Sequence, residues 1–294
     1  MSFFLNCLAN VKENSQTFYS EENYFHKGKM RSYVFFLPKS KKAEYVFVGL
    51  HGRAGSGKEF FLKTEFYKVA EREGIALIFP DGFNRSWVDG RNLKVDDLSL
   101  DDKDFIINLT KDFCFKNNLM EKDRFLFGYS NGGFMTQKIA FEETDFFRAY
   151  ASIVSTISSN LSKKNPIVAQ NILFMNGTED PVVPFLGGEV TGGKGKILSS
   201  ANAVKIWKQK NLCTKSESNF LKDKFNDGVQ IKKTDFLDCK SIKKIRIFEM
   251  IGAGHGWPGK IESELSKSFG RFSEEISANE EIFEFFMNTR DPKK

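Results

Sequence analysis

The segment Gly128-Tyr129-Ser130-Asn131-Gly132-Gly133 could supply a nucleophile for acyl transfer. It has the form G-x-S-x-G and stands directly between a short apolar run, residues 124–127, and a segment with helical periodicity. In a nucleophile elbow the serine occupies a tight strand-to-helix turn, and the glycines on either side leave room for that turn. A plain glycine turn is the alternative, but the position between a strand and a helix favours Ser130 as the nucleophile.

A serine hydroxyl needs a base to take its proton, and histidine suits this role near neutral pH. The chain has three histidines, His26, His51 and His255. His255 stands in GAGHGWPG, a glycine-rich segment after the last apolar run, as expected for a loop at the carboxyl edge of a parallel sheet. His26 lies in a polar N-terminal stretch, and His51 belongs to a different motif. We therefore predict that His255 is the base, with an exposed loop histidine as the alternative.

The third member of a catalytic triad orients the imidazole and stabilises its charged form. The segment NGTEDP follows the apolar run of residues 172–175 and contains two acids, Glu179 and Asp180. Asp180 gives the chain order Ser, Asp, His, which is that of the α/β hydrolases. We predict Asp180 for this role, while Glu179 and a plain turn remain the alternatives.

Acyl transfer also needs backbone N–H groups that hold the oxyanion. Asn131 follows the nucleophile and is predicted to supply the first N–H group. The second is assigned to Arg53, in the loop HGRAGSG that follows an early apolar run. His51 would then be structural, with its ring tying this loop down.

The same loop supports a rival hypothesis. Residues 52–59, GRAGSGKE, nearly match the phosphate-binding pattern G-x-x-x-x-G-K-[ST]. Glu59 stands where that pattern needs a hydroxyl group for Mg²⁺, and its carboxylate would repel nucleotide phosphates. A P-loop NTPase and a binding protein without catalysis are therefore kept as alternatives to a serine hydrolase.

Apolar runs alternate with helical patterns along the chain. This alternation predicts a mostly parallel central sheet with helices on both faces, an α/β-hydrolase fold. We expect one domain over residues 1–294, with residues 184–243 forming an excursion over the sheet edge. Strands are expected at residues 31–37, 45–50, 75–79, 124–127, 149–154, 172–175 and 244–250, and helices at residues 58–73, 101–117, 131–141 and 274–289.

Composition narrows the classes of partner. The net charge of +6 comes from 44 basic and 38 acidic residues spread along the chain, so no nucleic-acid-binding arm is predicted. No apolar run reaches the roughly 18 residues that a membrane span needs. The apolar N-terminal residues 3–9 lack the basic region and cleavage site of a clear signal peptide. The expected partner is a small or oligomeric ester, with no metal or organic cofactor.

Six motifs occur in the order found in one known family. They are LHGRAGSG, FPDGFNRSWVDGR, DDKDFI, GYSNGGFM, NGTEDPVVPFLGG and GHGWPG, spread between about residue 30 and residue 290. The set resembles the polyhydroxybutyrate depolymerase-type esterases, relatives of the feruloyl and acetylxylan esterases. The resemblance implies hydrolysis through an acyl-serine intermediate, with Ser130, Asp180 and His255 as the triad and Arg53 in the oxyanion hole. A feruloyl or acetylxylan esterase is the alternative within this group.

The resemblance also implies roles for residues around the site. Trp87 and Trp257 fall in motifs that border the family's substrate cleft, and packing in the core is the alternative for each. Tyr129, beside the nucleophile, is added as a third substrate-binding residue. The chain departs from the family at Arg53, where relatives often have a small residue or cysteine, and at Val88, where they often have asparagine. The charge of Arg53 would favour acidic substrates or acyl groups.

Family members often pair a cysteine after a tryptophan-containing helix with a cysteine before the last strand. Cys213 and Cys239 occupy these places, so the resemblance implies a disulfide between them. Such a disulfide fits an oxidising compartment, so the resemblance and this cysteine pair favour a secreted or periplasmic location, whereas the lack of a clear signal peptide argues the other way.

Overall fold

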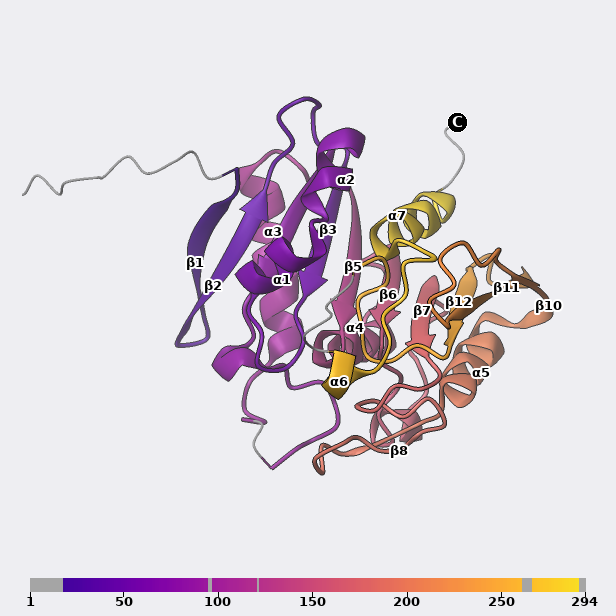
Figure 1. Cartoon of the computed structure of the whole chain (residues 1–294). Coiled ribbons are helices and arrows are strands. Elements are labelled where there is room, and N and C mark those ends of the chain that lie inside the picture. Colours follow the sequence, from indigo (N-terminus) through magenta and orange to yellow (C-terminus); the bar gives the residue numbers. More distant parts are fainter. Residues whose placement is uncertain (1–17, 95–96, 121, 261–265, 291–294) are drawn as a thin grey trace, which may run out of the picture.

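The structure, a computed structural model, describes residues 18–94, 97–120, 122–260 and 266–290. Its described part is built on a ten-stranded sheet with the order β1-β2-β4-β3-β5-β6-β7-β12-β11-β10 (Figure 1). The six strands from β4 to β12 in this order are parallel, and antiparallel strands flank them at both edges. In chain order the strands are β1 (Ser20–His26), β2 (Lys29–Phe36), β3 (Tyr45–Leu50), β4 (Ile75–Pro80), β5 (Asp123–Tyr129), β6 (Ala149–Ile153), β7 (Ile172–Gly177), β10 (Cys213–Phe220), β11 (Gln230–Cys239) and β12 (Ile245–Ile251).

Helices cover both faces of this sheet, which gives three layers (Figure 1). Along β3, Val46 and Val48 face the layer of α3, α4 and α5, while Phe47 faces the layer of α1, α2 and α7. This alternation with both sides buried explains why the central strands are continuous apolar runs. The helices are α1 (Gly57–Thr64), α2 (Tyr67–Glu73), α3 (Asp102–Lys116), α4 (Asn131–Glu142), α5 (Ser200–Asn211), α6 (Ser266–Phe269) and α7 (Ala278–Asn288).

The α/β-hydrolase fold predicted from the sequence is confirmed, with two corrections to its elements. The single helix expected over residues 58–73 is wrong, because Glu65 adopts φ 52° and separates α1 from α2. The polar strand β1 was not expected at all. It pairs with β2 at the edge of the sheet, where few of its side chains need to be apolar. No helix in the described ranges is long and apolar enough to cross a membrane.

Residues 184–243, expected to form an excursion over the sheet edge, divide into two parts. The first part forms the short hairpin of β8 (Gly188–Glu189) and β9 (Lys196–Ile197), followed by α5. The second part, β10 and β11, instead extends the sheet beyond β12. Most side chains of β10 are polar and exposed, so the strand carries no apolar pattern that the sequence could reveal. The implied disulfide is present and joins Cys213 to Cys239 across these two strands.

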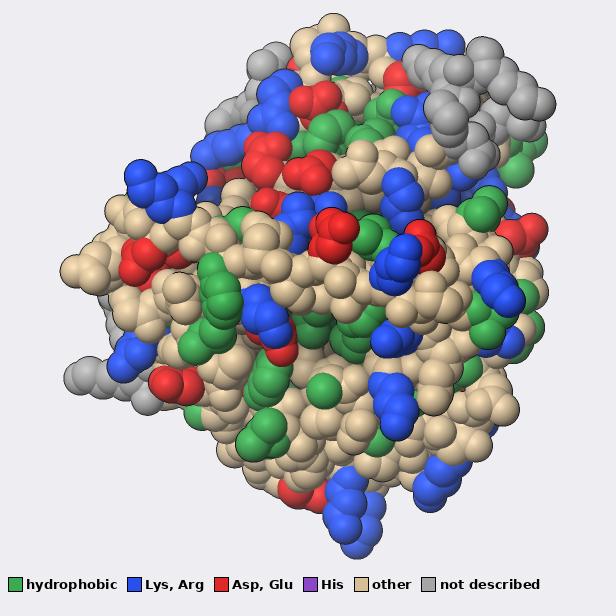
Figure 2. Space-filling model, turned by 90° about the vertical axis from the view of Figure 1, so that its right-hand side faces the viewer, with side chains coloured by type: hydrophobic (Ala, Val, Ile, Leu, Met, Phe, Trp, Pro, Cys, Tyr) green, Lys and Arg blue, Asp and Glu red, His purple; other side chains and the backbone are tan. Residues whose placement is uncertain are grey.

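The face of the molecule that includes this edge is shown in Figure 2. Basic and acidic side chains are interspersed over it, and the hydrophobic side chains form small separate groups. Charged side chains on an edge strand discourage pairing with the edge of another sheet. This surface pattern therefore suits the exposed position of β10.

Candidate active site

Four parallel strands end close to the candidate site, and each is followed by one of the predicted residues. Arg53 follows β3, Ser130 follows β5, Asp180 follows β7 and His255 follows β12. Because parallel strands all end at the same edge of a sheet, these four residues are brought to one place from segments far apart in the chain. The strand order accounts for their meeting.

Ser130 has the geometry typical of a nucleophile elbow. It lies between β5 and α4 with φ 53° and ψ −116°, a conformation that L-residues rarely adopt. Gly128 and Gly132 permit this turn, because a side chain at either position would collide with neighbouring backbone. An added Cβ would lie 2.2 Å from the Gly132 carbonyl oxygen at Gly128, and 2.1 Å from the Leu50 carbonyl oxygen at Gly132. The glycines of the motif are therefore required by close backbone packing.

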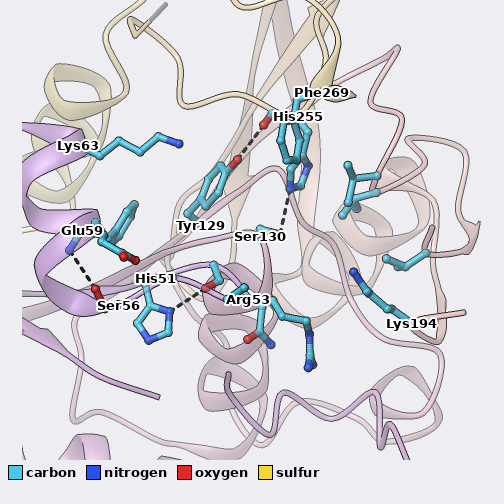
Figure 3. A pocket seen from close by; sticks show the side chains of 18 of the residues that line it. His51, Arg53, Ser56, Glu59, Lys63, Tyr129, Ser130, Lys194, His255 and Phe269 are labelled. Carbon is cyan, nitrogen blue, oxygen red and sulfur yellow. Dashed lines mark hydrogen bonds between the residues drawn. The ribbon is translucent and has the colours of Figure 1, made fainter. Parts of the chain in front are cut away.

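The three candidate triad residues form a continuous chain of hydrogen bonds, of which Figure 3 shows the one between Ser130 and His255. His255 Nε2 lies 2.9 Å from Ser130 Oγ, and His255 Nδ1 lies 2.7 Å from Asp180 Oδ2. The other carboxylate oxygen of Asp180 accepts the N–H groups of Val182 and Val183, both at 2.8 Å. With the Nδ1 proton donated to Asp180, Nε2 is left to accept the proton of the serine hydroxyl.

Several contacts fix the loop that carries His255. The His255 N–H donates to the Phe269 carbonyl at 2.6 Å, and the preceding Gly254 N–H donates to Arg271 O at 2.8 Å. The imidazole stacks on the Phe269 ring, with 5.9 Å between ring centroids. The Tyr129 hydroxyl donates to the His255 carbonyl oxygen at 2.7 Å. The histidine is therefore held in place beside Ser130 although it lies on a loop.

The two predicted oxyanion donors belong to segments that meet at Ser130. Asn131 is the first residue of α4, so its N–H has no acceptor within the helix and lies at the positive end of the helix dipole. The loop of Arg53 packs against the elbow, since an added Cβ at Gly52 would lie 2.9 Å from the Tyr129 ring and 3.4 Å from Ser130 Cβ. The structure thus brings the Arg53 loop and the start of α4 together at Ser130.

His51 is buried and anchors this loop, as the sequence predicts. Its Nδ1 donates to the Gly52 carbonyl at 2.7 Å, and its Nε2 accepts the Gly82 N–H at 2.8 Å. Burial lowers the pKa of His51 below its ordinary value, because the imidazolium would lose its hydration. The neutral ring therefore links the loop after β3 to the segment after β4.

The two tryptophans expected at the substrate cleft do not line it. Trp87 and Trp257 have 0% and 1% of their surface exposed. The Trp87 indole N–H donates to His51 O at 2.9 Å, and that of Trp257 donates to Asn279 Oδ1 at 3.2 Å. Both indoles thus satisfy their N–H groups inside the core, which is the packing alternative. Tyr129, the third residue expected at the cleft, does line the cavity.

A buried polar network behind Asn131 was missed by the sequence analysis. The Asn131 side-chain amide donates to Asp89 Oδ2 at 2.6 Å, and its carbonyl oxygen accepts the Trp87 N–H at 2.9 Å. Arg91 forms an ion pair with the same carboxylate oxygen at 2.6 Å. Asp89 and Arg91 stand two residues apart in the motif containing WVDGR, and this pair of opposite charges was the available signal. The network fixes the residue that follows Ser130.

A cavity of about 370 Å³ lies over Ser130 and His255 (Figure 3). Apolar side chains of Val182, Val183, Val190, Phe269 and Phe272 form part of its wall. Its charged lining residues are mostly basic: Arg53, Lys63, Arg91 and Lys194, with Glu59 as the acid. No group of three or more His, Cys, Asp or Glu side chains that could hold a metal ion occurs in the described ranges.

The loop that resembles a phosphate-binding motif is already bonded within the protein. The Gly57 N–H donates to Asp81 Oδ1 at 2.5 Å, and the Glu59 N–H donates to the Ser56 hydroxyl at 3.2 Å. Glu59 itself forms an ion pair with Arg85 at 2.8 Å. A phosphate cradle needs backbone N–H groups directed at the ligand, and here two of them serve the fold.

Comparisons with known proteins agree with this architecture. No family model matches the chain. It is 28% identical over 180 residues to "Probable feruloyl esterase C" of Aspergillus oryzae, covering 58% of this chain and 63% of the relative. It is 24% identical over 235 residues to "Feruloyl esterase B" of Piromyces equi, covering 78% of this chain and 42% of the relative. The chain thus spans less than two thirds of the length of these relatives.

The fold is shared with a solved esterase structure. The acetyl xylan esterase from Aspergillus awamori superposes with a TM-score of 0.56 at 14% identity, covering 80% of this chain and 94% of that chain. At this level of identity the likeness concerns the fold. The chain therefore has an α/β-hydrolase fold, with the hydrogen-bonded serine, histidine and aspartate at the carboxyl edge of its sheet.

Proposed function

We propose that this protein is a serine-dependent carboxylic-ester hydrolase. The observation that carries the proposal is the chain of hydrogen bonds from Ser130 through His255 to Asp180, at 2.9 and 2.7 Å, in which Ser130 and His255 line a cavity. If the Ser130 motif were only a glycine turn between a strand and a helix, neither a histidine hydrogen-bonded to the serine nor an aspartate hydrogen-bonded to that histidine would be needed. The names of the relatives, which are esterases, support the same reaction class.

The geometry accounts for both halves of the reaction. His255 Nε2 takes the proton of Ser130 Oγ as this oxygen attacks the ester carbonyl carbon, and Asp180 stabilises the resulting imidazolium. The N–H groups of Asn131 and Arg53 hold the oxyanion. His255 then gives the proton to the leaving alcohol, which departs and leaves an acyl group on Ser130. In the second half His255 activates water, which releases the acid and restores the serine.

The kind of ester that the protein hydrolyses is the second part of the proposal. The names of the relatives support a feruloyl or acetyl ester, whereas a hydroxybutyrate oligomer rests on the motif resemblance. The cavity of about 370 Å³ is within the size range of sites for small molecules. A short acyl group or one aromatic ring fits such a volume.

The test uses 4-nitrophenyl acetate and butyrate, methyl ferulate and hydroxybutyrate oligomers with the wild-type protein and the Ser130→Ala variant. We expect turnover of at least one ester and a loss of about 10³- to 10⁶-fold in rate when Ser130 is replaced. Ser99→Ala, at an exposed serine outside the cavity, is the matched control and should keep the wild-type rate.

Two outcomes would contradict the proposal. Wild-type rates in Ser130→Ala would assign the hydrolysis to another group. Failure of a fluorophosphonate to label the folded wild-type protein at Ser130, together with no turnover of any ester, would favour a binding protein on the same fold.

A further inference from the structure

Lys194 lies in the turn of the hairpin formed by β8 and β9, and it lines the cavity over Ser130. In Figure 3 its side chain extends from the hairpin toward the part of the cavity that contains Ser130 and His255. The cavity lining also includes the apolar side chains of Val182 and Val190, and the Lys194 N–H donates to the Val190 carbonyl oxygen at 3.1 Å. A cationic group is thus presented beside an apolar wall, close to where the ester must bind.

The charged side chains near Lys194 bond to groups other than its ammonium. Arg91 is paired with the buried carboxylate of Asp89 at 2.6 Å. Glu189, on the same hairpin, accepts the Gly195 N–H at 2.9 Å, and the Asp180 carboxylate is bonded to His255. Within the described residues, no acidic side chain forms an ion pair with the Lys194 ammonium group. An anionic group of a ligand would therefore meet the Lys194 ammonium without competition from an acidic side chain that is already paired with it.

The backbone of Lys194 is fixed to the catalytic machinery. The Arg91 guanidinium donates to the Lys194 carbonyl oxygen at 3.2 Å and lies over the Phe134 ring at 4.3 Å. The same guanidinium holds Asp89, which accepts a hydrogen bond from Asn131. Two side chains thus connect the hairpin to the residue next to Ser130. The backbone of Lys194 therefore has a defined position relative to Ser130.

We propose that Lys194 determines substrate specificity by binding an anionic group, in particular a carboxylate, on the ester that the enzyme hydrolyses. The inference rests on the proposed ester-hydrolase function and names the substrate class of the same site. An ammonium in a partly enclosed cavity attracts the anion and selects against uncharged analogues. The carboxylate keeps its charge from the bound state to the transition state, so the contact acts mainly on KM.

The test compares two activated esters of similar length, 4-nitrophenyl hydrogen adipate, which ends in a carboxylate, and 4-nitrophenyl heptanoate, which ends in a methyl group. Lys194→Met keeps the length of the side chain and removes its charge. Lys196→Met is the matched control, because Lys196 is an exposed neighbour on β9 that does not line the cavity.

We expect the wild-type protein to prefer the adipate ester. Lys194→Met should lower kcat/KM for this ester about fivefold, mainly through KM, the effect expected of a partly exposed ion pair. The heptanoate ester should change less than twofold, and Lys194→Glu should lower the adipate rate further. Raising the salt concentration from 0.05 to 0.5 M should reduce the preference of the wild type, with a smaller effect in Lys194→Met, as screening requires.

The outcomes that overturn the inference differ from those that overturn the proposed function. Serine-dependent hydrolysis with the same adipate-to-heptanoate ratio in wild type, Lys194→Met and Lys196→Met removes the role of Lys194 and leaves the ester hydrolase intact. A preference for adipate that persists in Lys194→Met likewise assigns the anion to another group. Absence of Ser130-dependent turnover of both esters overturns the proposed function, and the inference with it.

Discussion

Glycines serve opposite purposes at the nucleophile elbow and in the hairpin that carries Lys194. At Gly128 and Gly132 an added Cβ would lie 2.2 and 2.1 Å from backbone carbonyl oxygens. At Gly188 and Gly193 no heavy atom lies within 4 Å of such a Cβ, but φ is +107° and +68°. Gly128 and Gly132 are needed because neighbouring backbone approaches closely, whereas Gly188 and Gly193 are needed because the chain must turn in open space.

This difference separates two demands on the site. The groups that carry out the reaction must keep their positions within a fraction of an ångström, and close packing provides this rigidity. Lys194, the group that we propose recognises the substrate, lies on an exposed hairpin, where a change of side chain disturbs little else. We therefore expect reaction rate to depend on the elbow and substrate preference to depend on the hairpin.

The largest contrast is expected between Gly132→Ala and Gly193→Ala. The new methyl group of Gly132→Ala meets Leu50 O, so the start of α4 and the end of β3 must move apart. A shift of about 1 Å at reacting groups can cost 100-fold, and we expect kcat/KM to fall at least that far. Gly193→Ala, with open space around it, should lose about 1 kcal/mol through backbone strain and keep its activity within about twofold. Ester hydrolysis and urea unfolding measure both effects.

Equal loss of activity in the two variants would break the comparison, because the hairpin would then matter as much as the elbow for the reaction itself. Circular dichroism of Gly132→Ala distinguishes local displacement from loss of the fold. A folded Gly132→Ala with wild-type activity would mean that the backbone contact with Leu50 is not needed to position Asn131.

The sequence was most informative where a single local pattern implies one geometry. The elbow around Ser130 could be predicted because a strand, a G-x-S-x-G turn and a helix follow one another directly. Asp180 and His255 could be predicted because each follows an apolar run, and parallel strands end at the same edge. The break between α1 and α2 could not, since the left-handed conformation of Glu65 leaves no trace in the apolar periodicity.

Sequence reasoning failed where the answer depends on three-dimensional surroundings. Trp87 and Trp257 stand in the right motifs but lie behind the cavity, because their indole N–H groups find acceptors inside the core. The ion pair of Asp89 and Arg91 joins residues two positions apart, a spacing common on solvated surfaces as well. Only burial between α4 and the hairpin distinguishes this pair from a surface pair.

A second prediction compares this buried ion pair with an exposed one. Asp89→Asn removes the charge that neutralises Arg91 and leaves a buried cation, so we expect the free energy of unfolding to fall by about 3 to 5 kcal/mol. Glu59→Gln breaks the exposed pair with Arg85 and should cost less than about 1 kcal/mol. Urea unfolding at pH 7.5 measures both variants. Similar losses of unfolding free energy in the two variants would show that the hydrogen bonds and ion pair of Asp89 do not stabilise the structure around Asn131.

The smallest effect concerns His51, the neutral ring that anchors the loop after β3. Because burial lowers its pKa below the ordinary value of 6.5, the unfolded chain binds more protons than the folded chain as the pH falls below 6.5. The stability that neutral His51 contributes is therefore present above pH 6.5 and declines toward its folded pKa. One such group changes the free energy of unfolding by at most about 1.4 kcal/mol per pH unit.

His51→Gln isolates this slope, since the glutamine carbonyl can accept the Gly82 N–H and does not titrate. The free energy of unfolding, measured in urea from pH 7.5 to pH 5.0, should fall less steeply in His51→Gln than in the wild type. Groups that titrate in both proteins cancel in the difference. An identical slope in the two proteins would mean that His51 accepts a proton in the folded state as readily as in the unfolded state. The loop holding Arg53 would then tolerate a charged anchor, and the rigidity of the elbow side would rest on the backbone contacts of its glycines.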